Sequence, residues 1–341
     1  MDTELQRLQH LGFFAIFKES YNIIVSWWRK LFFQIFLALI LPFCFLILAN
    51  MLISDHLSGK IINNHVNLDD TMSFYPSYNR IKRELVVQWS LLGVFTLLYF
   101  LIGLIGFYLF SISAVSYGVA CFYAPKDTNF KQVIRVVPKA WKKLVITYLL
   151  YCFIQFVCIV VFIALIAICI LMGMARQIVL GIVIGVIVLI LFIVGLIYFN
   201  VIWSMASVVS VLEEWYGLGS FRRSLDLMKG KKKLNIWVYM VFQVLFSVVQ
   251  GGYWVLAGLF NSSLPIVVYV IVAIFFFVLF LGLVLLGFVV QTVLYLVCKS
   301  HHHEISGKSS LGDQLDGFLG GYGRMGERER SAIRTSWSLM C

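Results

Sequence analysis

Six long apolar runs limit this chain to folds that cross a membrane. They occupy residues 31–54, 86–117, 144–172, 178–211, 234–260 and 264–297. A helix needs about 20 mostly apolar residues to cross a hydrocarbon core of roughly 30 Å, and each run has that length. None shows the apolar–polar alternation of a transmembrane β-strand. Because backbone groups in lipid must be hydrogen-bonded within the protein, we predict an all-α integral membrane protein with six transmembrane helices.

The positions of the basic residues predict which side of the membrane each end occupies. The segments before the first run, between the second and third, between the fourth and fifth, and after the sixth hold 4, 6, 6 and 6 of the 27 Lys and Arg residues. The segments on the other side hold 4, 1 and 0. Cytosolic loops carry the excess of Lys and Arg, so we expect both termini in the cytosol.

Three similar segments precede the first, third and fifth apolar runs. They read FKESYNIIVSWWRKLFFQ from Phe17, FKQVIRVVPKAWKKLVIT from Phe130 and FRRSLDLMKGKKKLNIW from Phe221. Such self-similarity indicates structural repeats. We predict three units of an amphipathic helix followed by a helical hairpin, over about 13–123, 128–211 and 219–297. These units form one membrane domain, 1–300, and a partly disordered cytosolic tail follows at 301–341.

In each copy, apolar residues recur at the spacing of one helix face. The predicted faces are Phe17, Tyr21, Ile24 and Trp28, then Phe130, Ile134, Val137 and Trp141, then Phe221, Leu225 and Met228. Pro138 and Gly230 interrupt the second and third copies. Both residue types break helices in an interior position, so we expect those two helices to end or bend there.

A basic pair followed by Leu ends each copy, which is typical of a helix lying in the membrane interface with Lys and Arg among the phosphates. Each basic residue near an anionic leaflet contributes about 1 kcal/mol of attraction. The predicted lipid-headgroup contacts are Arg29, Lys30, Lys142, Lys143, Arg222, Arg223, Lys231, Lys232 and Lys233. The alternative is that these are ordinary topology-determining flanks whose similarity is coincidental.

Two stretches of the chain resemble known families. The run VVSVLEEWYGLGSFRRSLDLMKGKKKLNIW, residues 208–237, resembles a motif of bacterial YciC-like proteins and of the membrane domain of some glycerophosphodiester phosphodiesterases. From LQHLGFFAIFKESYNII to CKSHHHEISGKSSLGDQLDGFLG, the chain is similar to uncharacterised plant six-span membrane proteins. The first resemblance places Glu213 at the motif's acidic position. Neither implies an activity, because the phosphodiesterase chemistry of the fusion proteins belongs to a separate soluble domain.

The predicted spans contain no Asp, Glu, Lys, Arg or His, and their polar residues are mainly Gln34, Gln88, Gln155, Asn200, Gln243, Gln250 and Gln291. Ionisable groups inside a membrane mark proton relays and ion-coupled transport, so their absence disfavours an active transporter. We expect Glu213 to pair with Arg222 or Arg223. Residues His301 to Glu304 lack a second ligand cluster for zinc, so we interpret them as a solvated segment. We predict no catalytic residue, cofactor or metal site.

These observations favour a non-catalytic multi-pass protein that organises or senses membrane through its basic interfacial helices. The net charge of +11 is explained by cytosolic flanks, so anionic membrane lipid is the expected partner rather than nucleic acid; protein partners and oligomeric state are left open. The alternative is a facilitative transporter or channel for a small solute, which predicts a wide polar cavity lined by the Gln and Asn residues. The endoplasmic reticulum and the plasma membrane suit spans of this length equally.

Overall fold

The structure is a computed structural model that describes residues 12–27, 32–69, 76–124, 130–174, 178–260 and 266–302. Within these ranges the regular elements are all helical. Six helical stretches are long and apolar enough to cross a membrane. The predicted all-α class and the number of spans are confirmed to that extent. The predicted tail and the pair Arg29–Lys30 lie outside the described residues, apart from the first two positions of the tail.

The helices follow one another with short connections. Their bounds are α2 Phe13–Trp27, α3 Phe33–Ile35, η2 Phe36–Ile40, α4 Leu41–Asp69, α5 Pro76–Leu98, η3 Tyr99–Tyr108, α6 Leu109–Tyr123, α7 Phe130–Met174, α8 Ile178–Leu212, α9 Leu218–Leu227, α10 Lys232–Phe260 and α11 Ile266–His301. The two π-helical stretches η2 and η3 join their neighbours through residues in the α-helical backbone region. The first two spans are therefore single helical rods with a wider turn inside each.

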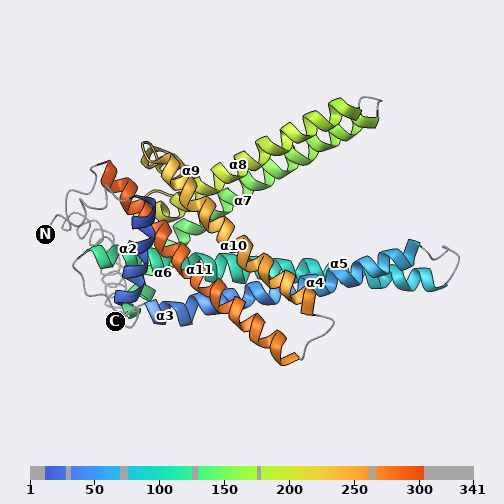
Figure 1. Cartoon of the computed structure of the whole chain (residues 1–341), viewed down its shortest axis with the longest axis horizontal. Coiled ribbons are helices and arrows are strands. Elements are labelled where there is room, and N and C mark those ends of the chain that lie inside the picture. Colours follow the sequence, from blue (N-terminus) through green and yellow to red (C-terminus); the bar gives the residue numbers. More distant parts are fainter. Residues whose placement is uncertain are drawn as a thin grey trace, which may run out of the picture.

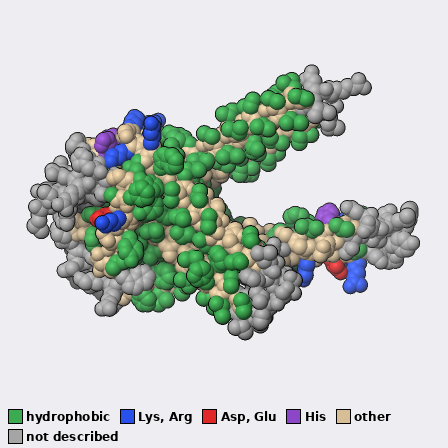
Figure 2. Space-filling model, viewed as in Figure 1, with side chains coloured by type: hydrophobic (Ala, Val, Ile, Leu, Met, Phe, Trp, Pro, Cys, Tyr) green, Lys and Arg blue, Asp and Glu red, His purple; other side chains and the backbone are tan. Residues whose placement is uncertain are grey.

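Three helical hairpins meet at one end of the molecule and spread apart at the other (Figure 1). We call the common end, at the left of the view, the converging end. The α4–α5 hairpin and the α7–α8 hairpin leave it as two long arms, and α10 packs against α11. Within the α7–α8 arm, the rings of Phe162 and Phe192 stack with centroids 3.9 Å apart. Figure 2 shows that the surface of this arm is almost entirely hydrophobic, as expected of helices surrounded by lipid.

The core lies at the converging end. Every residue of α6 except Phe110 and Phe122 is buried, and α6 packs against the last turns of α8 and α11, which also pack against each other. A hydrogen bond between hydroxyl groups connects α6 to α11: Ser116 Oγ lies 3.1 Å from Thr292 Oγ1. By contrast, only 6% of the most apolar window of α7 or α8 is buried. Protein packing therefore fixes one end of the bundle, and the arms face lipid.

Helix α7 does not end at Pro138, because it continues through this residue as one helix from Phe130 to Met174; the expected alternative, a bend at this residue, stays a prediction. Proline removes one backbone hydrogen bond, but packing against α6 compensates for that loss. Val133, Val137 and Leu144 are buried on either side of the proline. The indole of Trp141 donates to the Ile105 carbonyl at 2.7 Å. The basic pair Lys142–Lys143 therefore lies within a helix rather than in a turn.

The third copy breaks where the sequence predicts. Helix α9 ends at Leu227, Gly230 adopts a φ of +90°, and Lys232 begins α10. Glycine adopts this left-handed conformation without the steric cost that other residues incur.

The predicted apolar face of the third copy is buried at Phe221 and Met228, whereas those of the first two copies differ in part from the observed ones. Tyr21 is 63% exposed and Ile134 is 43% exposed, although both belong to the predicted faces. The buried stripe instead runs through Ile16, Ser20 and Ile23 in α2. Helix α2 packs against α11, so its most apolar side faces protein, and the neighbouring residues face outward. An outward apolar residue carries no hydrophobic cost where the surroundings are lipid.

Candidate functional site

A buried ionic cluster joins the end of α8 to α9 and to the last turn of α11. Glu213 Oε1 accepts hydrogen bonds from Tyr295 Oη at 2.7 Å and from Lys299 Nζ at 3.0 Å. Glu213 Oε2 accepts one from Arg223 Nε at 3.2 Å. The side chain of Lys299 is 5% exposed, so this contact forms away from bulk solvent. The predicted pairing with Arg223 is confirmed, whereas the partners on α11 were not anticipated.

The surroundings of Glu213 keep its carboxyl group ionised. Burial by itself disfavours the charged form, but the charge of Lys299 and the hydrogen bonds from Tyr295 and Lys299 outweigh it, with a smaller contribution from Arg223. The pKa of Glu213 is therefore lowered below its ordinary value. Both carboxylate oxygens are occupied by these bonds. The arrangement fits a structural clamp, in agreement with the role expected from the sequence.

A second group of polar side chains holds α9 against α7 and α8. Thr147 Oγ1 accepts a hydrogen bond from the Gly217 backbone N–H at 2.9 Å and lies 2.9 Å from Ser210 Oγ. Ser220 Oγ donates to the Ala206 carbonyl at 2.7 Å. All of these side chains are buried. Gly217 has a φ of +58°, which lets the chain reverse between α8 and α9.

The last turn of α11 also holds the turn that follows α9. His302 Nε2 lies 3.2 Å from the Leu227 carbonyl and 3.1 Å from the Lys229 carbonyl. Asn235 Nδ2 donates to the buried thiol of Cys298 at 3.4 Å. His302 is exposed, as expected of a solvated segment, although its ring also contacts this turn; His303 and Glu304 lie outside the described residues.

Outside this cluster, a cavity of about 570 Å³ lies among the helices of all six spans. It is lined by Phe43 and Ile47 of α4, Leu104 and Tyr108 of η3, Tyr148 and Tyr151 of α7, Asn200, Trp203 and Ser204 of α8, and by one side of α10 and of α11. Four of the seven predicted span residues, Asn200, Gln243, Gln250 and Gln291, line it. The other three do not: Gln88, for example, accepts a hydrogen bond from Asn64 at 3.1 Å. No charged side chain lines the cavity among the described residues.

One face of α10 supplies a continuous polar part of the cavity wall. Asn235, Tyr239, Gln243, Ser247 and Gln250 all line the cavity, and their spacing of four, four, four and three residues places them on one side of a helix. Within the described part of the chain, Tyr239, Gln243 and Ser247 make no side-chain hydrogen bond. The sequence already contained this stripe, but its apolar interruptions concealed it.

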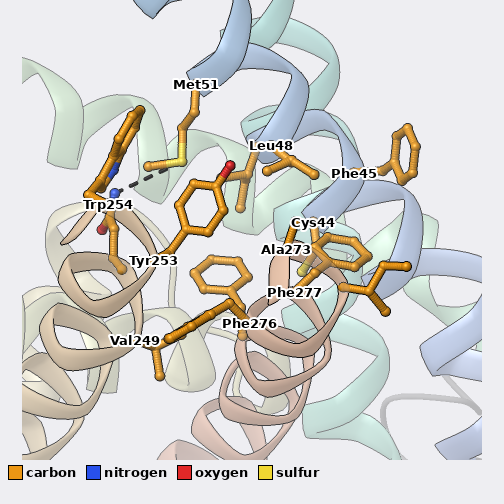
Figure 3. A pocket seen from close by; sticks show the side chains of 14 residues that line it. Cys44, Phe45, Leu48, Met51, Val249, Tyr253, Trp254, Ala273, Phe276 and Phe277 are labelled. Carbon is orange, nitrogen blue, oxygen red and sulfur yellow. Dashed lines mark hydrogen bonds between the residues drawn. The ribbon is translucent and has the colours of Figure 1, made fainter. Parts of the chain in front are cut away.

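An apolar pocket of about 430 Å³ adjoins the cavity between α4, α10 and α11 (Figure 3). The rings of Tyr253, Phe276 and Phe277 lie in it, opposite Leu48 and Met51 of α4. Gln250 belongs to both linings, as do Ile47 and Phe280. Gln250 donates to the sulfur of Met51 at 3.9 Å, and a thioether is a weak acceptor. The polar cavity and the apolar pocket therefore share a boundary.

The predicted lipid-headgroup residues differ in what they contact. Lys142, Arg222, Lys232 and Lys233 are exposed, whereas Lys143 and Lys231 are partly buried. Arg223 is held by Glu213, as described above. Figure 2 shows Lys and Arg at the converging end and at the far end of the α4–α5 arm, with hydrophobic surface between them. In the described residues, no group of three His, Cys, Asp or Glu side chains could hold a metal ion.

Comparison with known proteins places the chain in a family without assigning it an activity. No curated protein and no solved structure matches it, so the resemblance to YciC-like proteins and to phosphodiesterase membrane domains stays a prediction. The family model described as a domain of unknown function (DUF8558) matches residues 1–331. That match includes all six spans, the ionic cluster and the cavity. The chain therefore belongs to the family defined by this domain of unknown function, DUF8558.

Proposed function

We propose that this protein is a non-catalytic multi-pass membrane protein that organises or senses membrane by contacting anionic lipid headgroups. The observation that carries the proposal is the exposure of Lys142, Arg222, Lys232 and Lys233. Lys142, Lys232 and Lys233 lie near the start of an apolar span, and Arg222 lies in α9 between two spans. Interfacial Lys and Arg interact with lipid phosphates at this depth. The positive-inside rule predicts that the converging end faces the cytosol, where the leaflet is negatively charged.

Matching burial in the three copies supports their origin as repeats. Counting from the Phe that begins each copy, the residues three positions later are Ser20, Val133 and Ser224, and those six positions later are Ile23, Val136 and Leu227. All six are buried. Each copy therefore turns the same side toward the bundle, which favours three equivalent units within one membrane domain.

The electrostatic contribution of the exposed residues is substantial at low ionic strength. At about 1 kcal/mol for each basic residue near an anionic leaflet, four residues give roughly 4 kcal/mol. The attraction decays over a Debye length of about 10 Å at 0.1 M salt. Arg223 contributes less because its charge is balanced by Glu213. Fixed basic positions on the second and third hairpins would select anionic lipids around the bundle rather than merely anchor it.

Native mass spectrometry of the full-length protein from nanodiscs containing phosphatidylserine and phosphatidylcholine tests this proposal. A variant with Lys142, Arg222, Lys232 and Lys233 changed to Ser should retain several-fold less phosphatidylserine than the wild type. A matched control changes Lys60, Arg80, Lys82 and Arg83, at the opposite end, to Ser and removes the same charge. Equal phosphatidylserine retention by the wild type and both variants would refute the proposal.

The cavity favours a second candidate, a facilitative path for a small uncharged solute. Its wall carries Gln and Asn side chains, as expected of a path for a polar solute. The buried core of α6, α8 and α11 weighs against it, because Val293 and Val297 are completely buried at the converging end. Swelling of proteoliposomes in glycerol or urea tests this candidate: swelling that is faster than in empty vesicles and slower in the Gln243→Leu variant supports it, and equal rates refute it.

A further inference from the structure

The polar cavity and the apolar pocket together have the chemistry of a site for one amphipathic molecule. Their volumes, about 570 and 430 Å³, each fall within the roughly 300–1,000 Å³ typical of ligand pockets. They share the lining residues Ile47, Gln250 and Phe280. A ligand that extends across this boundary would place a polar part beside the α10 stripe and an apolar part among the aromatic rings shown in Figure 3.

The polar wall indicates an uncharged headgroup. Tyr239, Gln243 and Ser247 line the cavity, and no described residue satisfies their side-chain hydrogen-bonding groups. Gln243 and Ser247 are exposed and therefore open to a ligand, and a polar group without a partner is costly against lipid. A ligand hydroxyl, carbonyl or amide would satisfy them. A phosphate would not be neutralised, because the described lining contains no Lys, Arg or His, and burying an unpaired charge is far more costly than burying a dipole.

The position of the apolar pocket indicates entry from the bilayer. Its rim includes Phe45, Trp254 and Ile274, which are exposed on the outer surface of the helices. Toward the converging end, the cavity is bounded by the buried residues Val290 and Leu294. A molecule dissolved in the membrane therefore meets an opening, whereas a water-soluble molecule from the converging end meets the packed core.

We propose that the cavity and the pocket bind a single membrane lipid with an uncharged, hydroxyl-bearing headgroup, of the diacylglycerol class. The headgroup lies beside Tyr239, Gln243 and Ser247, and an acyl chain fills the space between α4, α10 and α11. Any bilayer lipid can occupy an apolar pocket, so the polar stripe is the part that selects among lipids. The inference goes beyond the proposed function and does not depend on the basic residues at the converging end.

Photo-crosslinking of the full-length protein in nanodiscs tests the inference. The probes are diacylglycerol, phosphatidic acid and phosphatidylcholine, each with the same diazirine-bearing acyl chain, and labelled peptides are mapped by mass spectrometry. We expect diacylglycerol to label peptides containing residues 44–51, 249–254 and 273–280 several-fold more than the other two probes. Unlabelled diacylglycerol should compete.

Two variants separate the headgroup from the chain. Gln243→Leu with Ser247→Ala should reduce the preference for diacylglycerol over phosphatidic acid, and Ala273→Phe should reduce labelling by filling the pocket. Gln155→Leu, an amide outside the cavity, and Val248→Phe, on the exposed side of α10, are the controls. Equal labelling by diacylglycerol and phosphatidic acid, or labelling unaffected by either variant, would overturn the inference. The charge-removal variants should keep this labelling even if anionic-lipid retention fails, so the two proposals fail separately.

Discussion

The ammonium group of Lys299 donates a hydrogen bond of 3.0 Å to the carboxylate of Glu213, 86 residues earlier in the chain. This contact ties the end of the second hairpin to the end of the third. The same carboxylate holds Arg223 of α9, so a helix bearing a basic segment is fixed relative to both hairpins.

Changing Glu213 to Gln should destabilise the protein markedly. The change leaves the nearly buried ammonium of Lys299 without a carboxylate, and removing one partner of a buried pair costs about 3–5 kcal/mol. Changing Lys299 to Met as well should recover part of that loss. The control is Glu214→Gln, because Glu214 is exposed. Chemical unfolding in detergent measures these free energies, and equal stability of the Glu213 and Glu214 variants would contradict the clamp.

The same contact predicts a specific acid sensitivity. The folded-state pKa of Glu213 is lowered, so its stabilising contribution is fully present above the ordinary glutamate pKa of about 4.3. The contribution is lost as the pH falls through the lower folded-state value. The free energy of unfolding attributable to this group should therefore stay constant from pH 8 to about 5 and decrease at lower pH. A decrease between pH 7 and 5 that disappears in Glu213→Gln would contradict this assignment.

Changing Gly230 to Ala should destabilise the turn between α9 and α10. Its φ of +90° is strained for a residue with a side chain, and an added Cβ would lie 2.7 Å from His301 Nε2. Left-handed backbone alone costs about 1–2 kcal/mol. Gly251→Ala is the control, since nothing lies within 4 Å of its added Cβ and Ala favours helix by about 1 kcal/mol. Thermal unfolding should separate the two variants, and a stable Gly230→Ala protein would refute the turn conformation.

Thr147→Val should loosen the attachment of α9. Valine keeps the shape but leaves the Gly217 N–H without its acceptor, and an unsatisfied buried donor costs about 1–3 kcal/mol. Thr147→Ser keeps the hydroxyl and should lose less. Hydrogen exchange at the Gly217 amide measures the loss of this hydrogen bond directly. We expect faster exchange in the valine variant alone, and unchanged exchange would contradict the contact.

Sidedness is testable with single cysteines in a background lacking the native ones. A cysteine replacing Lys232 should react with an impermeant maleimide once the plasma membrane is selectively permeabilised. A cysteine replacing Lys82 should react in intact cells if the protein resides in the plasma membrane, and only after full solubilisation if it resides in the endoplasmic reticulum. Reaction of the cysteine at Lys232 in intact cells, or, for a protein of the endoplasmic reticulum, reaction of the cysteine at Lys82 after selective permeabilisation, would contradict the positive-inside assignment.

The sequence predicts local features well here and distant contacts poorly. The six spans follow from length and apolarity alone. The break at Gly230 follows from glycine's ability to adopt a positive φ without steric cost. The sequence alone does not show that α7 continues through Pro138, because tertiary packing around Val137 and Leu144 offsets the lost hydrogen bond. The burial of Lys299 could not be predicted from its position near a helix end. The only local signal is Tyr295, which lies four residues earlier, one helical turn away on the same face.

The cavity, too, could be predicted only in part from the sequence. The sequence supplies the Gln and Asn residues, but which of them meet depends on how each helix is rotated about its axis. In a membrane both protein-facing and lipid-facing sides are apolar, so hydrophobic periodicity does not fix that rotation. The polar residues from Asn235 to Gln250 lie on one side of α10, but the apolar residues between them concealed that side in the sequence.

Selection of anionic lipid by the converging end is measured most directly by energy transfer from the protein's tryptophans. Trp141, Trp215 and Trp237 lie near the exposed basic residues in sequence. In liposomes containing the full-length protein, transfer to dansyl-phosphatidylserine should exceed transfer to dansyl-phosphatidylcholine at low salt and fall to the same level at high salt, where charges are screened. Equal transfer to the two lipids at low salt would contradict this selection.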